Sequence, residues 1–173
     1  MVSLVSKVKI NREIIKSIER SPVPLLGIDY KVKIVYKNIN ITELDINNKI
    51  IKISLPNKFK KMQDVTVLDI VIEKMYEQIA IVEIERAMEK YRVILGIAPE
   101  EFLIKNIKKL ANCRKNVITI NPKIVTYNRE VIDYIVLRQY CNLKYKVNSK
   151  EFLKLIKKYK PNYRKCEEIL MKI

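Results

Sequence analysis

The order of the hydrophobic patterns along the chain predicts an α+β fold. Residues 29–55 alternate apolar and polar side chains, as half-buried strands do. From Asp64 onward the apolar residues recur at helical spacing, and a short strand-like stretch and further helical segments follow. The predicted order is strands, a long helix, a small hairpin and then further helices. This order lacks the repeated strand–helix–strand alternation of a doubly wound sheet.

The N-terminal part is expected to form a strand meander. One strand is predicted over residues 29–37 and another over residues 49–55, which Pro56 ends, and residues 38–44 are expected to add a short strand between them. We therefore expect a sheet of about three antiparallel strands. Its buried side chains are expected to be Tyr30, Val32, Ile34, Tyr36, Ile51, Ile53 and Leu55.

A long helix is predicted from Asp64 to Leu95, where Gly96 supplies a C-terminal stop, with a break near Ile81 as the alternative. Most of its glutamates, Glu83 among them, are expected to face water. The buried stripe is expected to contain Val67, Leu68, Val71, Met75, Ile79, Val82, Arg86 and Tyr91.

The C-terminal part is expected to begin with two short strands, residues 101–108 and 117–120, around a polar turn at residues 113–116. Helices should follow. Asn128 and Ser149 are good N-caps for helices that end at about Lys144 and at Lys158, and Pro161 is suited to open a last short helix.

The composition fits a single folded domain rather than a disordered chain. The 173 residues are 49% hydrophobic, which is enough for a sizeable core. We expect N-terminal strands in residues 1–60 and a helical domain in residues 61–173, together forming one compact unit. The 35 Lys and Arg outnumber the 19 Asp and Glu, so the formal charge is +16.

The chain contains no histidine, which excludes Ser-His-Asp and Cys-His catalysis and the common zinc sites. Cys113, Cys141 and Cys166 fit neither a disulfide framework nor a Cys-x-x-Cys metal site, so a reducing, cytoplasmic setting is expected. No segment has the pattern of a signal peptide or a membrane span, and we expect a soluble protein without a membrane partner.

A colinear series of short motifs resembles the YgjP-like zinc metallopeptidase domain, which is grouped with the SprT-like and WLM proteases of the zincin type. The resemblance covers about residues 65–172 and implies a zincin-like fold: a small antiparallel or mixed sheet, a long helix, a helix of the active-site type and C-terminal helices. The motifs are Ile107-Lys-Lys-Leu-Ala-Asn-Cys113, Val117-Ile-Thr-Ile-Asn121, Val131-Ile-Asp-Tyr-Ile-Val-Leu-Arg-Gln-Tyr-Cys-Asn-Leu143, Asn148-Ser-Lys-Glu-Phe152 and Lys160-Pro-Asn-Tyr163.

In that family two histidines one helical turn apart and a third histidine hold zinc, and a glutamate beside the first acts as general base. The resemblance places Arg138 and Asn142 at the first two ligands, Gln139 at the base and Asn148 at the third ligand. A guanidinium has no lone pair for a metal, and amides are poor zinc ligands and poor bases. The resemblance therefore implies that zinc is lost and that no catalytic residue remains.

Our first hypothesis is a catalytically inactive metallopeptidase-like protein whose cleft serves as a peptide- or protein-binding module. Arg138 would fill the vacated metal position. We expect it to be hydrogen-bonded to Asn142, Asn148 or a carboxylate such as Glu151 or Asp133.

The alternative hypothesis is nucleic-acid binding through the basic segment 144–165, in which Lys154, Lys157, Lys158 and Arg164 are the candidate contacts. Interleaved tyrosines could stack on bases, but lysine is also the ordinary solvated face of a helix. A third reading, an enzyme of unrelated chemistry, finds no recognisable nucleophile or phosphate loop. The basic residues of the segment, against the single acid Glu151, are Lys144, Lys146, Lys150, Lys154, Lys157, Lys158, Lys160, Arg164 and Lys165.

Overall fold

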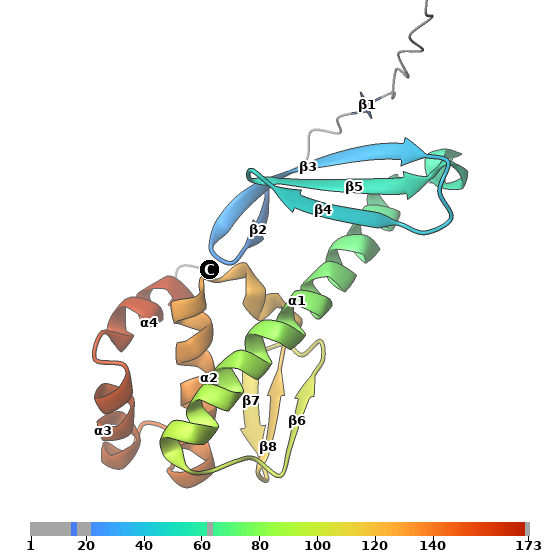
Figure 1. The fold of residues 1–173 in the computed structure, drawn as a ribbon. Coiled ribbons are helices and arrows are strands. Elements are labelled where there is room, and N and C mark those ends of the chain that lie inside the picture. Colours follow the sequence, from blue (N-terminus) through green and yellow to red (C-terminus); the bar gives the residue numbers. More distant parts are fainter. Residues whose placement is uncertain (1–14, 17–21, 62–63, 172–173) are drawn as a thin grey trace, which may run out of the picture. The chain divides into compact units, whose positions relative to one another are not determined.

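The structure, a computed structural model, describes residues 15–16, 22–61 and 64–171 (Figure 1). These residues fall into two compact units. The first contains 15–16, 22–23, 30–61 and 64–67, and the second contains 24–29 and 68–171. The expected boundary between residues 60 and 61, and the expectation that residues 1–60 and 61–173 form one compact unit, stay predictions.

The first unit contains a mixed sheet in the order β1-β3-β5-β4 (Figure 1). The sheet differs from the predicted antiparallel meander: β3 and β5 pair in parallel, with Ile34 opposite Ile53, and β4 pairs antiparallel with β5. The short middle strand also lies later in the sequence than residues 38–44. The strands are β1 (Ile15–Lys16), β3 (Ile28–Lys37), β4 (Glu43–Asn47) and β5 (Ile50–Pro56).

Burial explains this strand order. The strand β4 is exposed along most of its length, whereas Ile51, Ile53 and Leu55 of β5 are at most 1% exposed. The apolar β5 therefore takes the central position and the polar β4 the edge. Asn48 and Lys49 both have positive φ, as the tight turn of a β-hairpin requires, and this turn commits β4 to pairing with β5.

The helix α1 (Asp64–Leu95) follows the 3-10 turn η1 (Asn57–Lys61) and runs without a break at Ile81. The predicted stripe is wrong in its middle: Val82 is 65% exposed and Glu83 is 4% exposed. No helix in the described part of the chain is both long and apolar enough to cross a membrane. The observed stripe contains Leu68, Ile72, Met75, Tyr76, Ala80, Ile84, Ala87, Met88 and Tyr91.

The second unit contains a three-stranded sheet in the order β6-β8-β7. The strand β6 (Glu101–Ile104) is parallel to β8 (Val117–Ile120), and β7 (Ala111–Arg114) pairs antiparallel with β8. The predicted strand 101–108 is therefore too long, and the hairpin partner of β8 is β7. Lys115 and Asn116 form the turn with positive φ, which places the turn two residues after Cys113.

The three predicted C-terminal helices are confirmed: α2 (Arg129–Lys144), α3 (Lys150–Tyr159) and α4 (Tyr163–Met171). The side chains of Asn128 and Ser149 cap α2 and α3 as expected, accepting hydrogen bonds from the N–H groups of Val131 and Phe152. Residues 131–137 of α2 are all buried, and α2 contacts β7, α3 and α4. These elements confirm the α+β fold class.

A turn at Leu26 and Gly27, between β2 (Val23–Leu25) and β3, is anchored to the start of α2. The amides of Leu26 and Gly27 donate to the carbonyls of Val125 and Thr126 in the 3-10 turn η2 (Pro122–Thr126). The Tyr76 hydroxyl donates to the Pro24 carbonyl at 2.7 Å. Residues 24–29 therefore belong to the second unit, although in sequence they lie between β1 and most of β3, which belong to the first unit's sheet.

Candidate binding cavity

A cavity of about 440 Å³ lies between the start of β7 and one face of α2. The strand side contributes Asn112 and the helix side Arg138, and α3 and α4 contribute Phe152 and Leu170. All of these residues belong to the second unit. The complete lining is Lys109, Leu110, Ala111, Asn112, Cys113, Ile135, Arg138, Gln139, Asn142, Val147, Phe152 and Leu170.

Three of the four residues at the predicted metal-site positions share this cavity. Arg138 and Asn142 line it together because residues four apart lie on the same helical face, and Gln139 also lines it. The Gln139 side-chain amide donates to the Ile135 carbonyl at 3.3 Å. The fourth, Asn148, is exposed in the connection to α3 with φ of 63°, and its neighbour Val147 is the lining residue.

The surroundings of Arg138 differ from the expected ones. Its Nη1 lies 3.4 Å from the Tyr134 hydroxyl and 3.6 Å from Glu167 Oε1, rather than on Asn142, Asn148 or Glu151. The guanidinium also lies over the rings of Tyr134 and Phe152, at 5.7 and 5.9 Å. Asp133 is not a partner because five residues of helix separate it from Arg138 by about 140° around the axis.

Asp133 instead joins an ionic network between α1 and α2. Its two carboxylate oxygens accept from Arg86 and Lys90 at 2.6 and 2.5 Å. The buried Glu83 carboxylate accepts from Arg129 at 2.6 Å and from Arg86 at 3.1 Å. These hydrogen bonds, above all those of Arg129, hold the pKa of Glu83 below its usual value. The network fixes the two helices that flank the core.

Tyr134 is a buried hydrogen-bond donor beside Arg138. Its side chain is 1% exposed, and its hydroxyl donates to Glu167 Oε1 at 2.6 Å. Burial, and then this hydrogen bond, raise the pKa of Tyr134 above its usual range, so the phenol stays protonated. Glu167 is therefore satisfied mainly by Tyr134 and only loosely by Arg138.

The cysteines near the cavity are unsuited to nucleophilic chemistry. Burial raises the pKa of the Cys113 thiol, and burial raises that of Cys141 to about 12. Both thiols are therefore protonated at neutral pH, whereas the thiolate is the reactive form. Among the residues that the structure describes, no group of three or more His, Cys, Asp or Glu side chains is placed to hold a metal ion.

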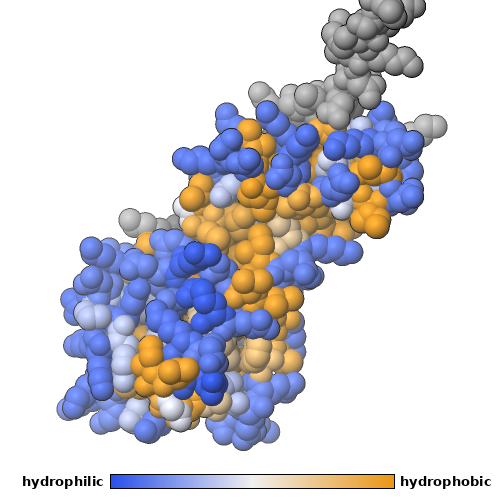
Figure 2. All heavy atoms as spheres, in the orientation of Figure 1, coloured by the Kyte–Doolittle hydropathy of each residue, from blue (hydrophilic) through white to orange (hydrophobic). Residues whose placement is uncertain are grey.

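The candidate nucleic-acid contacts Lys154, Lys157, Lys158 and Arg164 are all exposed on α3 and α4, whose surface is mostly hydrophilic in Figure 2. Lys157 and Arg164 line a hollow of about 450 Å³ together with Lys165. The ammonium of Lys158 lies 5.1 Å from the centre of the Tyr159 ring. The structure thus brings two of the four residues to one hollow.

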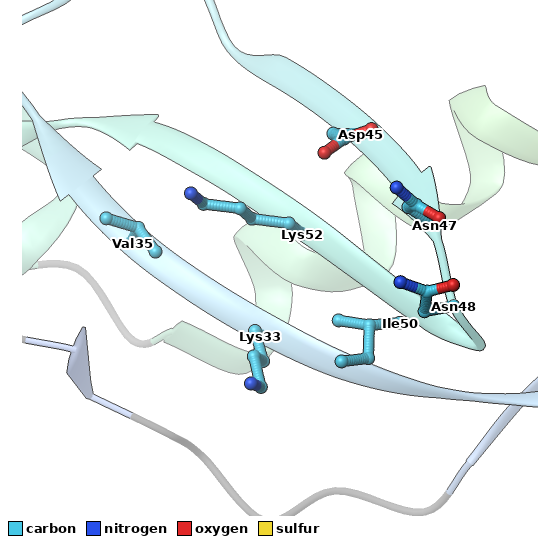
Figure 3. Close-up of a pocket in the computed structure, with 7 residues that line it drawn as sticks. All are labelled: Lys33, Val35, Asp45, Asn47, Asn48, Ile50 and Lys52. Carbon is cyan, nitrogen blue, oxygen red and sulfur yellow. The ribbon is translucent and has the colours of Figure 1, made fainter.

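The first unit has a separate hollow of about 270 Å³ on its sheet, which Figure 3 shows in close-up. Lys33, Lys52 and Asp45 come from three adjacent strands, and the register places Lys52 between the other two. Two lysines, one aspartate and two asparagines line it, so its charge does not select strongly for one class of ligand.

For the cavity between β7 and α2, the sequence did not single out the lining residues Lys109 and Asn112, or Glu167, which lies beside Arg138. Lys109 and Asn112 carry a signal, since both lie in the motif of residues 107–113, which leads into the hairpin of β7 and β8. Glu167 lies in the last helix, and its proximity to Arg138 depends on how α4 packs on α2, which no local pattern encodes.

The class of protein follows from comparison with known families. The model of the family described as "YgjP-like, metallopeptidase domain" matches residues 5–172. The chain therefore belongs to the YgjP-like family. A comparison with curated proteins gives no match.

Two solved structures are similar to part of the chain. The metallopeptidase zymogen abylysin of Pyrococcus abyssi matches with 23% identity and a TM-score of 0.47, over 51% of this chain and 92% of that one. The metallopeptidase zymogen jannalysin of Methanocaldococcus jannaschii matches with 16% identity and a TM-score of 0.46, over 51% of this chain and 94% of that one.

Proposed function

We propose that this chain is a catalytically inactive member of the metallopeptidase-like family that binds a polypeptide in the cavity between β7 and α2. One observation carries the proposal: the helical face presented by Arg138 and Asn142 lines a cavity, and Gln139 lines it beside them. This helical face is the one to which the resemblance assigns the family's metal site, and its chemical groups differ from those of the family.

The donor set of the cavity does not fit zinc. Zinc prefers thiolate, imidazole and carboxylate ligands, and a permanent guanidinium cation repels a dication. The polar side chains on the helical wall are one guanidinium and two amides, from Arg138, Gln139 and Asn142. A glutamine cannot take the proton from an attacking water as the family's glutamate does. We therefore infer that neither zinc binding nor peptide hydrolysis occurs at this site.

Polypeptide binding is supported by the size and lining of the cavity. A volume of about 440 Å³ is large enough for one or two side chains. Its walls combine apolar side chains such as Ile135 and Leu170 with the amides of Asn112 and Asn142. Apolar walls with a few placed polar groups are typical of pockets that bind organic ligands rather than hydrated ions.

The metal inference predicts that protein prepared in zinc-containing medium and then dialysed holds far less than one zinc per chain, because no set of suitable ligands meets in the cavity. Elemental analysis by mass spectrometry measures this. Cys113→Ser is the control variant, since it removes the one thiol that lines the cavity. Stoichiometric zinc that survives dialysis in the wild-type protein would contradict the proposal, and its loss in Cys113→Ser would place that zinc in the cavity.

The cysteines favour a reducing compartment, and we propose the cytoplasm. Cys113, Cys141 and Cys166 are all free thiols in the structure. Proteins of oxidising compartments more often pair such residues in disulfides.

Nucleic-acid binding is the second candidate function, and the exposed hollow beside Lys157 and Arg164 favours it. Under this hypothesis the triple change Lys154→Glu, Lys157→Glu and Lys158→Glu weakens binding of a single-stranded oligonucleotide at least tenfold. It also reduces the salt dependence, because each lost phosphate contact lowers the slope of log K against log salt by about 0.7.

The matched control for this test changes the same charge elsewhere, with Lys31→Glu, Lys33→Glu and Lys49→Glu on the exposed surface of the first unit. Fluorescence anisotropy at several salt concentrations measures both proteins. Equal losses in the two triple variants would mean that only net charge matters, and binding that ignores salt would exclude this function.

A further inference from the structure

The lining of the cavity that holds Arg138 is positively charged, and the Glu167 carboxylate beside Arg138 is not part of that lining. A second hollow of about 350 Å³ adjoins the main cavity, since Lys109 and Asn112 line both. Lys105 and Lys108 also line this second hollow. Of the described residues that line the two hollows, four are cations and none is Asp or Glu.

Arg138, which lines the main cavity, has unused hydrogen-bonding capacity. A guanidinium has five N–H donors, but the described contacts of Arg138 use only Nη1, at the long distances of 3.4 and 3.6 Å. The nearby Glu167 oxygen is already bound by Tyr134 at 2.6 Å. Nε and Nη2 have no hydrogen-bond partner among the described residues, so a fork of donors remains for a ligand.

The position of this guanidinium is nevertheless well defined. Its stacking over Tyr134 and Phe152 and its 31% exposed side chain indicate a group that is held by the protein but still reached by solvent. A half-buried arginine with free donors binds carboxylates well, because two parallel N–H groups match the two carboxylate oxygens.

We propose that the cavity binds a carboxylate of the polypeptide, which pairs with Arg138 and Lys109, while an adjacent apolar residue occupies the wall around Ile135 and Leu170. This inference rests on the proposed peptide-binding function and names its ligand class: an acidic or C-terminal segment. The amides of Asn112 and Asn142 are available to the peptide backbone. The lysines at 105 and 108 favour further acidic residues along the same segment.

A polypeptide fits this site better than a nucleic acid. Single-stranded nucleic acids are bound by exposed aromatic side chains on which bases stack. Phe152 is the aromatic residue that lines the cavity, and it is only 2% exposed. The apolar wall likewise matches an aliphatic side chain and would not contribute to the binding of a phosphate group.

Three peptides labelled at the N-terminus with an uncharged BODIPY dye test the proposal by anisotropy. The first is Gly-Ser-Ala-Leu-Ala-Leu with a free C-terminal carboxylate, the second is its C-terminal amide, and the third is the amide Gly-Ser-Glu-Leu-Ala-Leu. We expect the first or the third peptide, each of which carries a carboxylate, to bind at least tenfold more tightly than the second, which carries none. Such a gain is within the range of one charge-assisted hydrogen-bonded pair. The comparison of the two acidic peptides distinguishes a terminal from a side-chain carboxylate.

Two substitutions locate the carboxylate. Arg138→Met keeps an unbranched stem beside the two rings but removes the charge, so the affinity for the acidic peptides should fall to that for the amide. Arg138→Lys keeps the charge but loses the planar fork and should give an intermediate affinity. Arg114→Met is the matched control, because Arg114 is an exposed cation of β7 outside both hollows and its loss should change affinity less than twofold. Thermal unfolding of each variant checks that it folds.

The outcomes separate this inference from the function on which it rests. Measurable but equal affinity for the acidic and amide peptides overturns the carboxylate proposal and leaves peptide binding intact. The absence of binding by any peptide overturns both. An oligonucleotide that displaces the acidic peptide from the wild-type protein but not from Arg138→Met would show a general polyanion site and would also overturn the proposal.

Discussion

Replacing Glu83 with alanine is expected to lower the free energy of unfolding of the second unit by about 2–4 kcal/mol. The Glu83 side chain is 5% exposed and accepts hydrogen bonds from Arg129 and Arg86. Its loss removes the anion that draws these two arginines together between α1 and α2. The cost lies below that of a fully enclosed pair, because the Arg129 side chain is 65% exposed and can turn to water.

Urea unfolding followed by circular dichroism measures this effect, and Glu85→Ala is the control. Glu85 is an exposed glutamate on the same helix, and its replacement should change stability by less than about 0.5 kcal/mol. Equal effects of the two substitutions would mean that the ionic network contributes nothing beyond helix propensity.

The same network predicts how stability depends on pH. Because hydrogen bonds from Arg129 and Arg86 lower the pKa of Glu83 in the folded chain, Glu83 binds its proton more readily when the chain is unfolded. Its contribution is fully present above its usual pKa of 4.5 and is lost as the pH falls through the lower folded value. As the pH falls below 4.5, the free energy of unfolding of the wild-type protein should therefore decrease more than that of Glu83→Ala.

Replacing Gly27 with alanine is expected to destabilise the second unit by about 2–4 kcal/mol. Gly27 has φ of 79°, a conformation that costs an alanine about 1 kcal/mol. A Cβ at this position would also lie 2.8 Å from the Cβ and 3.1 Å from the backbone N of Asn128. The turn would have to move away from the residue that caps α2.

Gly96→Ala provides the matched control for this substitution. Gly96 has φ of 63°, but a Cβ there meets no atom within 4 Å, so only the backbone cost of about 1 kcal/mol applies. Denaturant unfolding of both variants measures the difference, which isolates the contact with Asn128. A Gly27→Ala protein as stable as Gly96→Ala would show that the turn at Leu26 and Gly27 adjusts freely.

Local signals predicted much of the fold. Asn128 and Ser149 mark the starts of α2 and α3 because their side chains cap the first turn, and Gly96 marks the end of α1 because it accepts positive φ. The strand pairing was not predictable in the same way. The turns at Asn48 and Lys115 contain no glycine, and the parallel pairing of β3 with β5 joins segments that are distant in sequence.

The candidate site was predictable to the extent that it lies on one helix. Arg138 and Asn142 share a face because of the helical repeat, and both line the cavity. Phe152 and Glu167 reach Arg138 from α3 and α4, and Arg129 reaches Glu83 from α2, so these contacts depend on tertiary packing. From the sequence of α1 alone, Glu83 is expected to face water, and only the packing of α2 places Arg129 beside it.

The two edges of the sheet in the second unit carry opposite charge. Beyond β6, a hollow of about 360 Å³ is lined by Glu85, Glu89, Glu100 and Glu101, with Arg92 as its cation, whereas the hollows beside β7 are lined by cations without carboxylates. An acidic partner diffusing towards this sheet is therefore attracted to one rim and repelled from the other before any contact forms. Added salt should slow such encounters while it changes the lifetime of the formed complex much less.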